Sequence, residues 1–492
     1  MKKFEKLGKV QRHRKRLLFA FLLSFSVFIC TAIMLFGLEI LFPYASHEGT
    51  GDGELGSSSL LLSGKPEYPT FLSSDLPSAS KLVEEATIFV SIAAFRDAEC
   101  ITTVESLLTR AKYPHRVFIG ISEERYEHDG SCINLTSVLH AMDITRTRTL
   151  RWIDIVPSAF TTEKDSLNES KPTPLLHKGR DNEVITCLLS SDAVNISLES
   201  ASSTSILDGC QIITRVGHPD DAFGPTYGRY VTSLFFNNQD YYMVIDSHSR
   251  FVPHWDMNMI ERARLMPTRG VLSHYPNGYT PANPDKEITK EDVMSMCKGV
   301  ILSNNIPKLG ARWIPIQSKP VLQSFVAAGY IFGDAQFVRD VPFDPYLPYL
   351  FDGEEILYTV RLWTNGWDTY SPAAAFIYHN YERNKAPRFW SIMMRKSVRG
   401  IRHMQQRTAV RRVLYLLQRC ELNSTKRIVS DEEAQVYNPA IGEAEKYYGV
   451  GKVRSLHSYW QFAELSDEFV KQRDNEGRWM GGEGLCKVRG EE

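Results

Sequence analysis

A carboxylate and an imidazole stand directly after an apolar run in the middle of the chain. Residues 241–245 read Tyr-Tyr-Met-Val-Ile, and Asp246, Ser247 and His248 follow them. The apolar run predicts a buried strand, and open α/β sheets bind ligands at the ends of their strands. Asp246 and His248 are two positions apart, and alternate positions of a strand face the same side. We therefore predict that Asp246 and His248 bind a divalent metal ion.

The ligand types narrow the choice of metal. Imidazole is a softer donor than carboxylate or water, so a site that contains His favours Mn²⁺ over Mg²⁺. Such an ion can act as a Lewis acid on the charge that grows on a departing diphosphate, for example that of a sugar nucleotide. An Asp-X-His triplet alone is common, and a His after a strand is often only a solvated turn residue. His379, which follows the short apolar run 375–378, is the candidate third ligand.

Two further positions combine charged or small residues with a predicted strand end. Arg96 and Asp97 follow the apolar run 87–94, where Arg could hold a phosphate and Asp could accept a hydrogen bond from a base or a ribose. A surface ion pair or a turn would explain the same two residues. Gly329 closes the Ala-Ala-Gly segment 327–329, which indicates either close approach of the backbone to a ligand or tight packing within a sheet.

Charged residues are concentrated at two predicted helices in the second half of the chain. The acidic segment 352–355, Asp-Gly-Glu-Glu, opens the predicted helix 356–365, and Gly366 is placed to end it. Acidic residues in a first turn also complement the helix dipole, so this acidity alone does not indicate catalysis. The basic stretch 393–419 is predicted to be helical, and its arginines could line an anionic substrate or form a solvated face.

The elements that carry these residues alternate between strands and helices. The apolar patterns predict strands at 87–94, 116–121 and 271–274 and helices at 99–112 and 225–236. The first strand, helix and strand form a βαβ unit, which implies a parallel sheet. The sequence therefore predicts an α/β fold for a catalytic domain over residues 87–387.

Composition divides the rest of the chain into three parts. Residues 39–86 are mostly rich in Gly, Ser and Pro and are predicted to form a stem. Residues 156–206 are rich in Ser and Thr and show weak periodicity, so we expect a surface insertion or a long loop. Residues 388–492 are expected to form a helical C-terminal region.

The charge balance argues against nucleic acid as a partner. Residues 1–16 carry eight Lys or Arg and one Glu; subtracting them from the totals of 57 basic and 58 acidic residues leaves 49 and 57, a net charge of -8. Phosphate backbones require a basic face. At 492 residues and 43 % hydrophobic, the chain can form two or three packed domains.

An uncharged apolar segment near the N-terminus predicts one membrane span. Residues 17–38 contain no charged side chain and are long enough to cross a bilayer as a helix. The basic segment 1–16 precedes them, so the positive-inside rule places the N-terminus in the cytosol and the remainder in the lumen. A cleaved signal peptide, with a small-residue site at 44–46, is the alternative.

Sequons and cysteines agree with a lumenal placement. The sequons begin at Asn134, Asn168, Asn195 and Asn423. Seven of the eight cysteines follow the predicted span, in an oxidising compartment, and no spacing among them indicates a zinc site. Their number is odd and their pairing is left open.

Several stretches in register also resemble one family. They are 88–97 (Ile-Phe-Val-Ser-Ile-Ala-Ala-Phe-Arg-Asp), 245–252 with Trp255 and Asp256, 351–355, 361–364 and 378–379. In this order they resemble the GlcNAc-transferases of glycosyltransferase family 60, which groups cytosolic hydroxyproline GlcNAc-transferases with trypanosomatid polypeptide α-GlcNAc-transferases. The similarity runs from about residue 87 to 459, interrupted by the segment 156–206.

The resemblance implies a GT-A (Rossmann-like) fold, a UDP-GlcNAc donor, a divalent metal such as Mn²⁺, and α-linked transfer with retention to a hydroxyl of a polypeptide. It implies nucleotide-sugar contacts at Arg96, Asp97, Arg229 and Gly329, metal ligands at Asp246, His248 and His379, and catalytic carboxylates at Asp352, Glu354 and Glu355. No residue identifies itself as a nucleophile, which favours same-face attack in which the leaving phosphate accepts the acceptor proton.

The predicted anchor separates this chain from the cytosolic members of the family. It favours a single-pass type II protein of the Golgi membrane that acts on a Thr/Ser-rich acceptor such as a mucin. Two alternatives remain open. The same fold could use another UDP-sugar, because no single residue identifies the donor, or it could belong to a catalytically silent, lectin-like protein.

Overall fold

A computed structural model of the chain describes residues 68–133, 136, 138, 141–155, 183–199, 205–280, 292–383, 386–393, 395, 399–418, 443–465, 472–473 and 479–481. The expected membrane span, residues 17–38, lies outside them. Within the described ranges, no helix combines the length and the apolarity needed to cross a membrane.

The predicted βαβ unit is confirmed and forms the centre of the molecule. Strand β1 (Ile88–Phe95), helix α2 (Cys100–Arg110) and strand β2 (Val117–Glu124) follow one another, and β1 pairs with β2 in parallel. Side chains of β1 alternate between the two faces of the sheet: Val90 and Ile92 pack in one core and Phe89 in the other. This alternation explains why the whole run is apolar, since both faces are covered.

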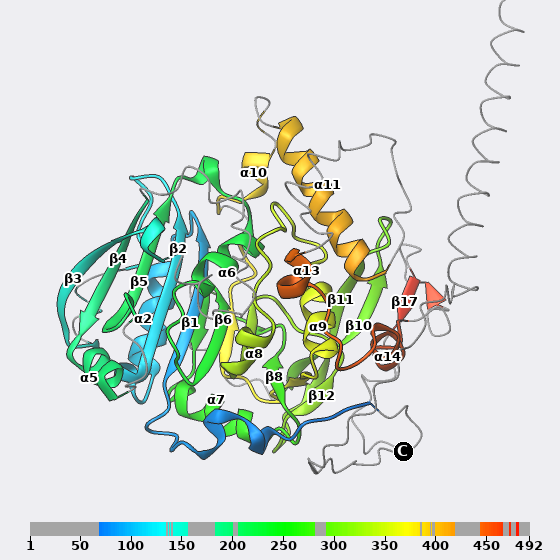
Figure 1. Ribbon diagram of the computed structural model, residues 1–492, viewed down its shortest axis with the longest axis horizontal. Helices are drawn as coiled ribbons and strands as arrows, with labels where there is room; N and C mark the ends of the chain where they lie inside the picture. Colours follow the sequence, from blue (N-terminus) through cyan, green and yellow to red (C-terminus); the bar gives the residue numbers. More distant parts are fainter. Residues whose placement is uncertain are drawn as a thin grey trace, which may run out of the picture. The chain divides into compact units, whose positions relative to one another are not determined.

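Ten strands form the main sheet (Figure 1), in the order β12-β14-β8-β13-β6-β1-β2-β5-β4-β3. The strands not yet given are β3 (Ile144–Arg151), β4 (Val184–Ser190), β5 (Cys210–Gly217), β6 (Tyr241–Asp246), β8 (Gly270–Ser273), β12 (Val321–Gln323), β13 (Tyr330–Asp334) and β14 (Asp368–Ser371). Strands β6, β1, β2 and β5 are parallel, whereas β13, β4 and β3 run antiparallel to their neighbours. The fold is therefore α/β with a mixed sheet.

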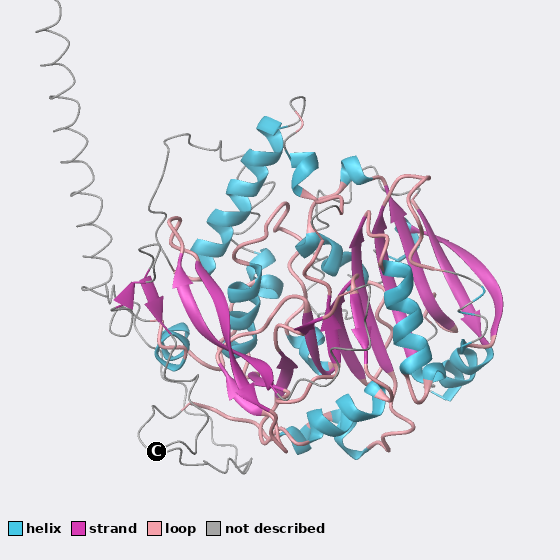
Figure 2. Ribbon diagram, turned by 180° about the vertical axis from the view of Figure 1, so that it is seen from behind, coloured by secondary structure: helices cyan, strands magenta, loops and turns pink. Residues whose placement is uncertain are grey.

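Helices cover both faces of this sheet (Figure 2). On one face, α2 and α7 (Trp255–Arg264) contribute to the same apolar core. On the other, α6 (Pro225–Ser233), α8 (Gln336–Asp340) and α9 (Glu354–Thr364) share a second core. Gly366 has φ of +84° just after α9, as expected of the residue predicted to end this helix.

A small three-stranded sheet lies beside the main one. It consists of β7 (Ser249–Phe251), β15 (Ile377–His379) and β9 (Asn277–Gly278). In its register His379 pairs with Ser249 and Tyr378 with Arg250. This pairing brings the end of β15 next to the residues that follow β6, although more than a hundred residues separate them in sequence.

The C-terminal part packs against α9. Helices α11 (Arg399–Leu416) and α14 (Leu456–Phe462) share an apolar core with α9 and with strand β11. The remaining elements there are α10 (Trp390–Met393), α13 (Glu443–Tyr448) and a sheet of β10 (Asp292–Ile301), β11 (Pro307–Pro315), β16 (Gln472–Arg473) and β17 (Trp479–Gly481). Figure 1 shows α9 between the main sheet and the β10–β11 hairpin.

One expectation is corrected by the structure. We expected residues 156–206 to be an insertion or a long loop, but β4 is a strand of the main sheet and α5 (Ser191–Glu199) follows it directly. Residues 184–190 read Val-Ile-Thr-Cys-Leu-Leu-Ser, a short and mostly apolar run, but the Ser/Thr content of the whole segment obscured it. The sequon residue Asn195 is exposed on α5; residues 156–182 lie outside the described part of the chain.

Two disulfides between described cysteines, whose pairing the sequence left open, join neighbouring elements. Cys100 pairs with Cys132 and ties the start of α2 to the segment after β2. Cys187 pairs with Cys210 and joins β4 to β5.

The described residues also include short 3-10 helices, namely η1 (Ser73–Asp75), η2 (Pro77–Ser80), η3 (Pro114–Arg116) and η5 (Pro219–Asp221).

Candidate functional site

The structure brings the three predicted metal ligands together. Asp246 ends β6, His248 follows it, and His379 ends β15; one donor atom of each lies within 4.8 Å of the others. His379 Nε2 is 3.2 Å from Asp246 Oδ2, and the two imidazole ring centres are 4.4 Å apart. A carboxylate and two imidazoles on different strands thus converge on one point at the edge of the sheet.

The ligand set has the chemistry and the space that a divalent ion requires. Burial lowers the pKa of His379 and so favours the neutral imidazole that metals bind. Burial alone would raise the pKa of Asp246, but the hydrogen bond with His379 and the charge of Arg229 lower it overall, which keeps the carboxylate ionised. Gly329 leaves room beside it, since a Cβ there would lie 2.7 Å from Asp246 Oδ2.

Asp97 holds the second ligand in place. Its Oδ2 lies 2.8 Å from His248 Nδ1 and accepts a hydrogen bond of 2.5 Å from Ser247 Oγ. Arg383 Nη2 approaches the same oxygen to 3.1 Å. A carboxylate on one ring nitrogen fixes the orientation of a histidine. The other ring nitrogen, Nε2, faces Arg383 Nη1 at 3.4 Å. Asp97 also lines the cleft, so its predicted nucleotide contact stays a prediction.

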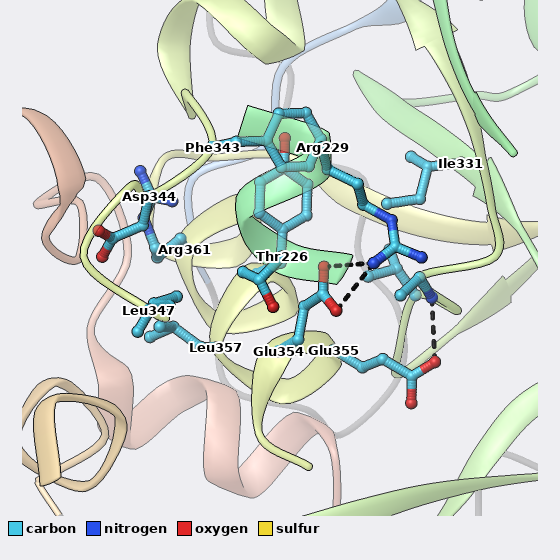
Figure 3. A pocket seen from close by; sticks show the side chains of 13 residues that line it. Thr226, Arg229, Ile331, Phe343, Asp344, Leu347, Glu354, Glu355, Leu357 and Arg361 are labelled. Carbon is cyan, nitrogen blue, oxygen red and sulfur yellow. Dashed lines mark hydrogen bonds and ion pairs between the residues drawn. The ribbon is translucent and has the colours of Figure 1, made fainter. Parts of the chain in front are cut away.

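Arg229 joins the metal-ligand set to the acidic helix. From α6, its Nη2 donates to Asp246 Oδ1 at 3.1 Å, and its Nη1 contacts both oxygens of Glu354 at 2.8 and 2.9 Å. Figure 3 shows this guanidinium facing Glu354 in the first turn of α9. Arg229 is buried, so its charge is balanced within the protein rather than by solvent.

The second carboxylate of that turn is held differently. Glu355 Oε1 accepts a hydrogen bond from the backbone N–H of Ala328 at 2.9 Å, and Oε2 accepts one from the Tyr275 hydroxyl at 3.1 Å. Burial raises the pKa of Glu355 to about 7. Asp352 lies at the mouth of the cleft and pairs with Lys308 at 3.2 Å.

Arg96 is the predicted site residue that the structure places apart. Its φ is +46°, and its guanidinium makes two hydrogen bonds, of 2.8 and 3.0 Å, to Asp129. The same group lies 4.6 Å from the ring centre of Tyr126. Arg96 is not among the residues that line the cleft, and its contacts are those of the surface pair that the sequence also allowed.

A cleft of about 580 Å³ opens onto these groups. The ends of β1 and β6, helix α6, the first turn of α9 and the loop after β15 line it. Tyr275 and Arg383 are lining residues that the sequence did not single out. Tyr275 follows the end of β8 by two residues, and Arg383 follows His379, the end of β15, by four. Their only signal in the sequence was this proximity to strand ends.

The family model described as "Glycosyltransferase (GlcNAc)" matches residues 87–469. No curated protein matches the sequence.

Three solved structures are among those that match this chain. GalNAc-T7 with UDP, GalNAc and Mn²⁺ is 14 % identical over 67 % of this chain and 48 % of its own, with a TM-score of 0.36, so this chain spans about half its length. Staphylococcus aureus TarS with UDP-GlcNAc is 8 % identical over 73 % of each chain (TM-score 0.29). Pyrobaculum calidifontis PcManGT with GDP-Man and Mn²⁺ is 7 % identical over 83 % of this chain and 92 % of its own (TM-score 0.31).

Proposed function

Because the chain belongs to the glycosyltransferase (GlcNAc) family, we propose that it transfers GlcNAc from UDP-GlcNAc to hydroxyl groups of a Thr/Ser-rich polypeptide. The observation that carries this proposal is the convergence of Asp246, His248 and His379 at a cleft that is also lined by the buried Glu354 and the half-buried Glu355. The cleft has room for a nucleotide sugar, since ligand sites of this kind are typically about 300–1,000 Å³.

Asp246, His248 and His379 would hold Mn²⁺, which would neutralise charge on the departing diphosphate. The neighbours keep these ligands ready to bind. Asp97 fixes the ring of His248, and Arg229 holds one oxygen of Asp246 while leaving Oδ2 on the side of His379. Such preorganisation lowers the cost of placing the donor for reaction.

The two glutamates would act on the sugar or on the acceptor. Glu354 contacts Arg229 through both of its oxygens, so its role is to set the shape and charge of the site. Glu355 lines the cleft, and with a pKa of about 7 it can exchange a proton near neutral pH. We propose transfer with retention, in which the acceptor hydroxyl attacks from the face of the leaving group and its proton passes to the departing phosphate.

The cellular setting completes the proposal. The uncharged segment 17–38 and the sequons support a single-pass type II protein of the Golgi membrane, with the catalytic domain in the lumen. There a mucin-like polypeptide would be the acceptor. The disulfides Cys100–Cys132 and Cys187–Cys210 suit that oxidising compartment.

A donor panel tests this function. The full-length protein is incubated with Mn²⁺, a Thr-rich peptide and UDP-GlcNAc, UDP-GalNAc, UDP-glucose or GDP-mannose, and the peptide is analysed by mass spectrometry. We expect addition of N-acetylhexosamine from UDP-GlcNAc, in α linkage. Transfer from one of the other donors only would show that UDP-GlcNAc is not the donor. If no donor supports transfer to any hydroxyl-bearing peptide, the lectin-like alternative would remain.

A further inference from the structure

Two arginines are buried beside a single carboxylate near the last turn of α9. Arg361 of α9 is 2 % exposed, and Arg412 of α11 is 0 % exposed. Arg412 Nε donates to Asp344 Oδ2 at 2.8 Å, and the other oxygen of Asp344 accepts from the backbone N–H of Tyr346 at 2.8 Å. Arg361 donates to the main-chain carbonyls of residues 449 and 447. Two cations thus share one carboxylate among the described residues.

The charges of two other buried arginines are neutralised differently. Each has two carboxylates: Arg215 contacts Glu124 and Glu183, and Arg229 contacts Asp246 and Glu354. Burial alone would lower the pKa of each of these two arginines, but the paired carboxylates raise it overall. The protein therefore neutralises these buried guanidinium groups with its own side chains.

The charge of Arg361 is not neutralised in this way. Burial lowers its pKa, and the attraction of Asp344 is too weak to restore it while Arg412 adds repulsion. With Asp344 as the single described carboxylate of the cluster, Arg361, Arg412 and Asp344 carry a formal net charge of about +1. A buried charge without a counterion is costly, of the order of several kcal/mol.

The same cluster contains donors without an acceptor. Nη1 and Nη2 of Arg412 are both buried, and neither has a hydrogen-bond partner within the described part of the chain. The guanidinium lies 5.7 Å from the ring centre of Tyr346, whose ring meets that of Tyr448 edge to face at 5.8 Å. The missing negative charge and the unused donors therefore occur in the same cluster of Arg361, Arg412 and Asp344.

We propose that the η-nitrogens of Arg412 bind a small inorganic anion such as chloride, which supplies the negative charge that this cluster lacks. A water molecule would accept the hydrogen bonds but would leave the charge unbalanced. The site is distinct from the cleft and does not depend on the reaction that the cleft performs.

The bound anion would stabilise the position of helix α9, whose first turn is acidic. Arg361 lies on α9, which begins with Glu354 and Glu355, and Arg412 lies on α11. A cavity of about 20 Å³ touches Asp344 and Arg361 on one side and Arg229 and Glu354 on the other (Figure 3). Close packing transmits a shift of the cluster to the first turn of α9.

Thermal unfolding in matched salts tests the proposal. The melting temperature of the full-length protein is measured while sodium gluconate is replaced by sodium chloride at constant ionic strength; gluconate is too large for a buried site. We expect a saturable rise of roughly 1–3 °C when chloride exceeds its Kd tenfold. Arg412→Met removes the charge and the donors, so it should abolish the chloride response.

A matched control separates anion binding from the loss of any buried arginine. Arg454 is also buried, but it faces one carboxylate, Asp368, at 2.6 Å, and its other nitrogens donate to main-chain carbonyls. Arg454→Met should lower the melting temperature and keep the chloride response. Equal melting temperatures of the native protein in the two salts, or a chloride response that survives Arg412→Met, would overturn the proposal.

If Arg412→Met does not fold, bromide provides a second measurement. Crystals of the native protein grown in bromide should show an anomalous peak within hydrogen-bond distance of the Arg412 η-nitrogens. A side chain of this chain or a water molecule at that place, with no anomalous signal, would refute anion binding.

Discussion

Replacing Gly329 with alanine tests how closely the backbone supports the metal site. A Cβ at position 329 would lie 2.7 Å from Asp246 Oδ2, which is shorter than real Cβ contacts allow. Asp246 cannot simply move aside, because Arg229 holds one oxygen at 3.1 Å and His379 approaches the other to 3.2 Å. The substitution must therefore break or distort one of these two interactions.

The size of the effect follows from those contacts. A hydrogen bond that involves a charged group contributes about 1.5–3 kcal/mol. At 1.4 kcal/mol for each factor of ten, Gly329→Ala should weaken Mn²⁺ binding by about 10- to 150-fold. The assay is a Mn²⁺ titration of GlcNAc transfer at saturating donor, with thermal unfolding to show that the variant is folded.

Gly310→Ala is the matched control. A Cβ at position 310 would meet Lys298 Cβ at 3.6 Å, an ordinary contact, so the Mn²⁺ dependence should stay that of the native protein. The reasoning fails if folded Gly329→Ala responds to Mn²⁺ as the native enzyme does.

Further predictions concern the charges around the cleft. Arg229→Met should reduce the free energy of unfolding by about 3–5 kcal/mol in urea titrations, because it leaves the buried Glu354 and the partly buried Asp246 without their shared cation. Exposed Arg339→Met should change this free energy little, and equal effects of the two substitutions would refute the bridge. Because burial raises the pKa of Glu355 from its ordinary value of 4.5 to about 7, its contribution to stability is complete below pH 4.5 and is lost as pH rises to about 7. That loss amounts to about 3 kcal/mol of the free energy of unfolding, measured between pH 5 and pH 8, and should be absent in Glu355→Gln. If Glu355→Gln shows the same pH dependence as the native protein, the raised pKa of Glu355 is contradicted.

The strands of the site could be predicted because their burial is local information. The apolar runs before Arg96 and before Ser247 are β1 and β6, and both end where the residue types change. The order of the strands could not be read in this way. An alternating pattern shows which faces are buried, but it does not show that β6 lies beside β1, about 150 residues earlier in the sequence.

The metal ligands illustrate the same division. The spacing of Asp246 and His248 indicated a shared site, whereas His379 depended on the family resemblance, and only the pairing of β15 with β7 brings it near Asp246. Asp97 and Arg229 were expected at the site, but their contacts with the ligands had no sequence signal. Asp97 contacts His248, and Arg229 contacts Asp246 and Glu354, through tertiary packing alone.

Arg96 and Asp97 follow the same strand but lie in different surroundings. Asp97 reaches the cleft, but the positive φ of Arg96 turns its side chain to Asp129, which stands 33 residues away. The segment 156–206 failed as an expectation for a related reason. Its Ser/Thr content suggested a loop, while the disulfide Cys187–Cys210 and the pairing of β4 with β5 place part of it in the main sheet.

The central claim is that Asp246, His248 and His379 form the metal centre of a GlcNAc-transferase. Electron paramagnetic resonance of Mn²⁺, recorded with the same samples that are assayed for GlcNAc transfer to a Thr-rich peptide, tests it most directly. Asp246→Ala and His379→Ala should each lose both Mn²⁺ binding and transfer, while Asp143→Ala, at an exposed position, should keep both. Native Mn²⁺ binding and transfer in folded Asp246→Ala would contradict the account.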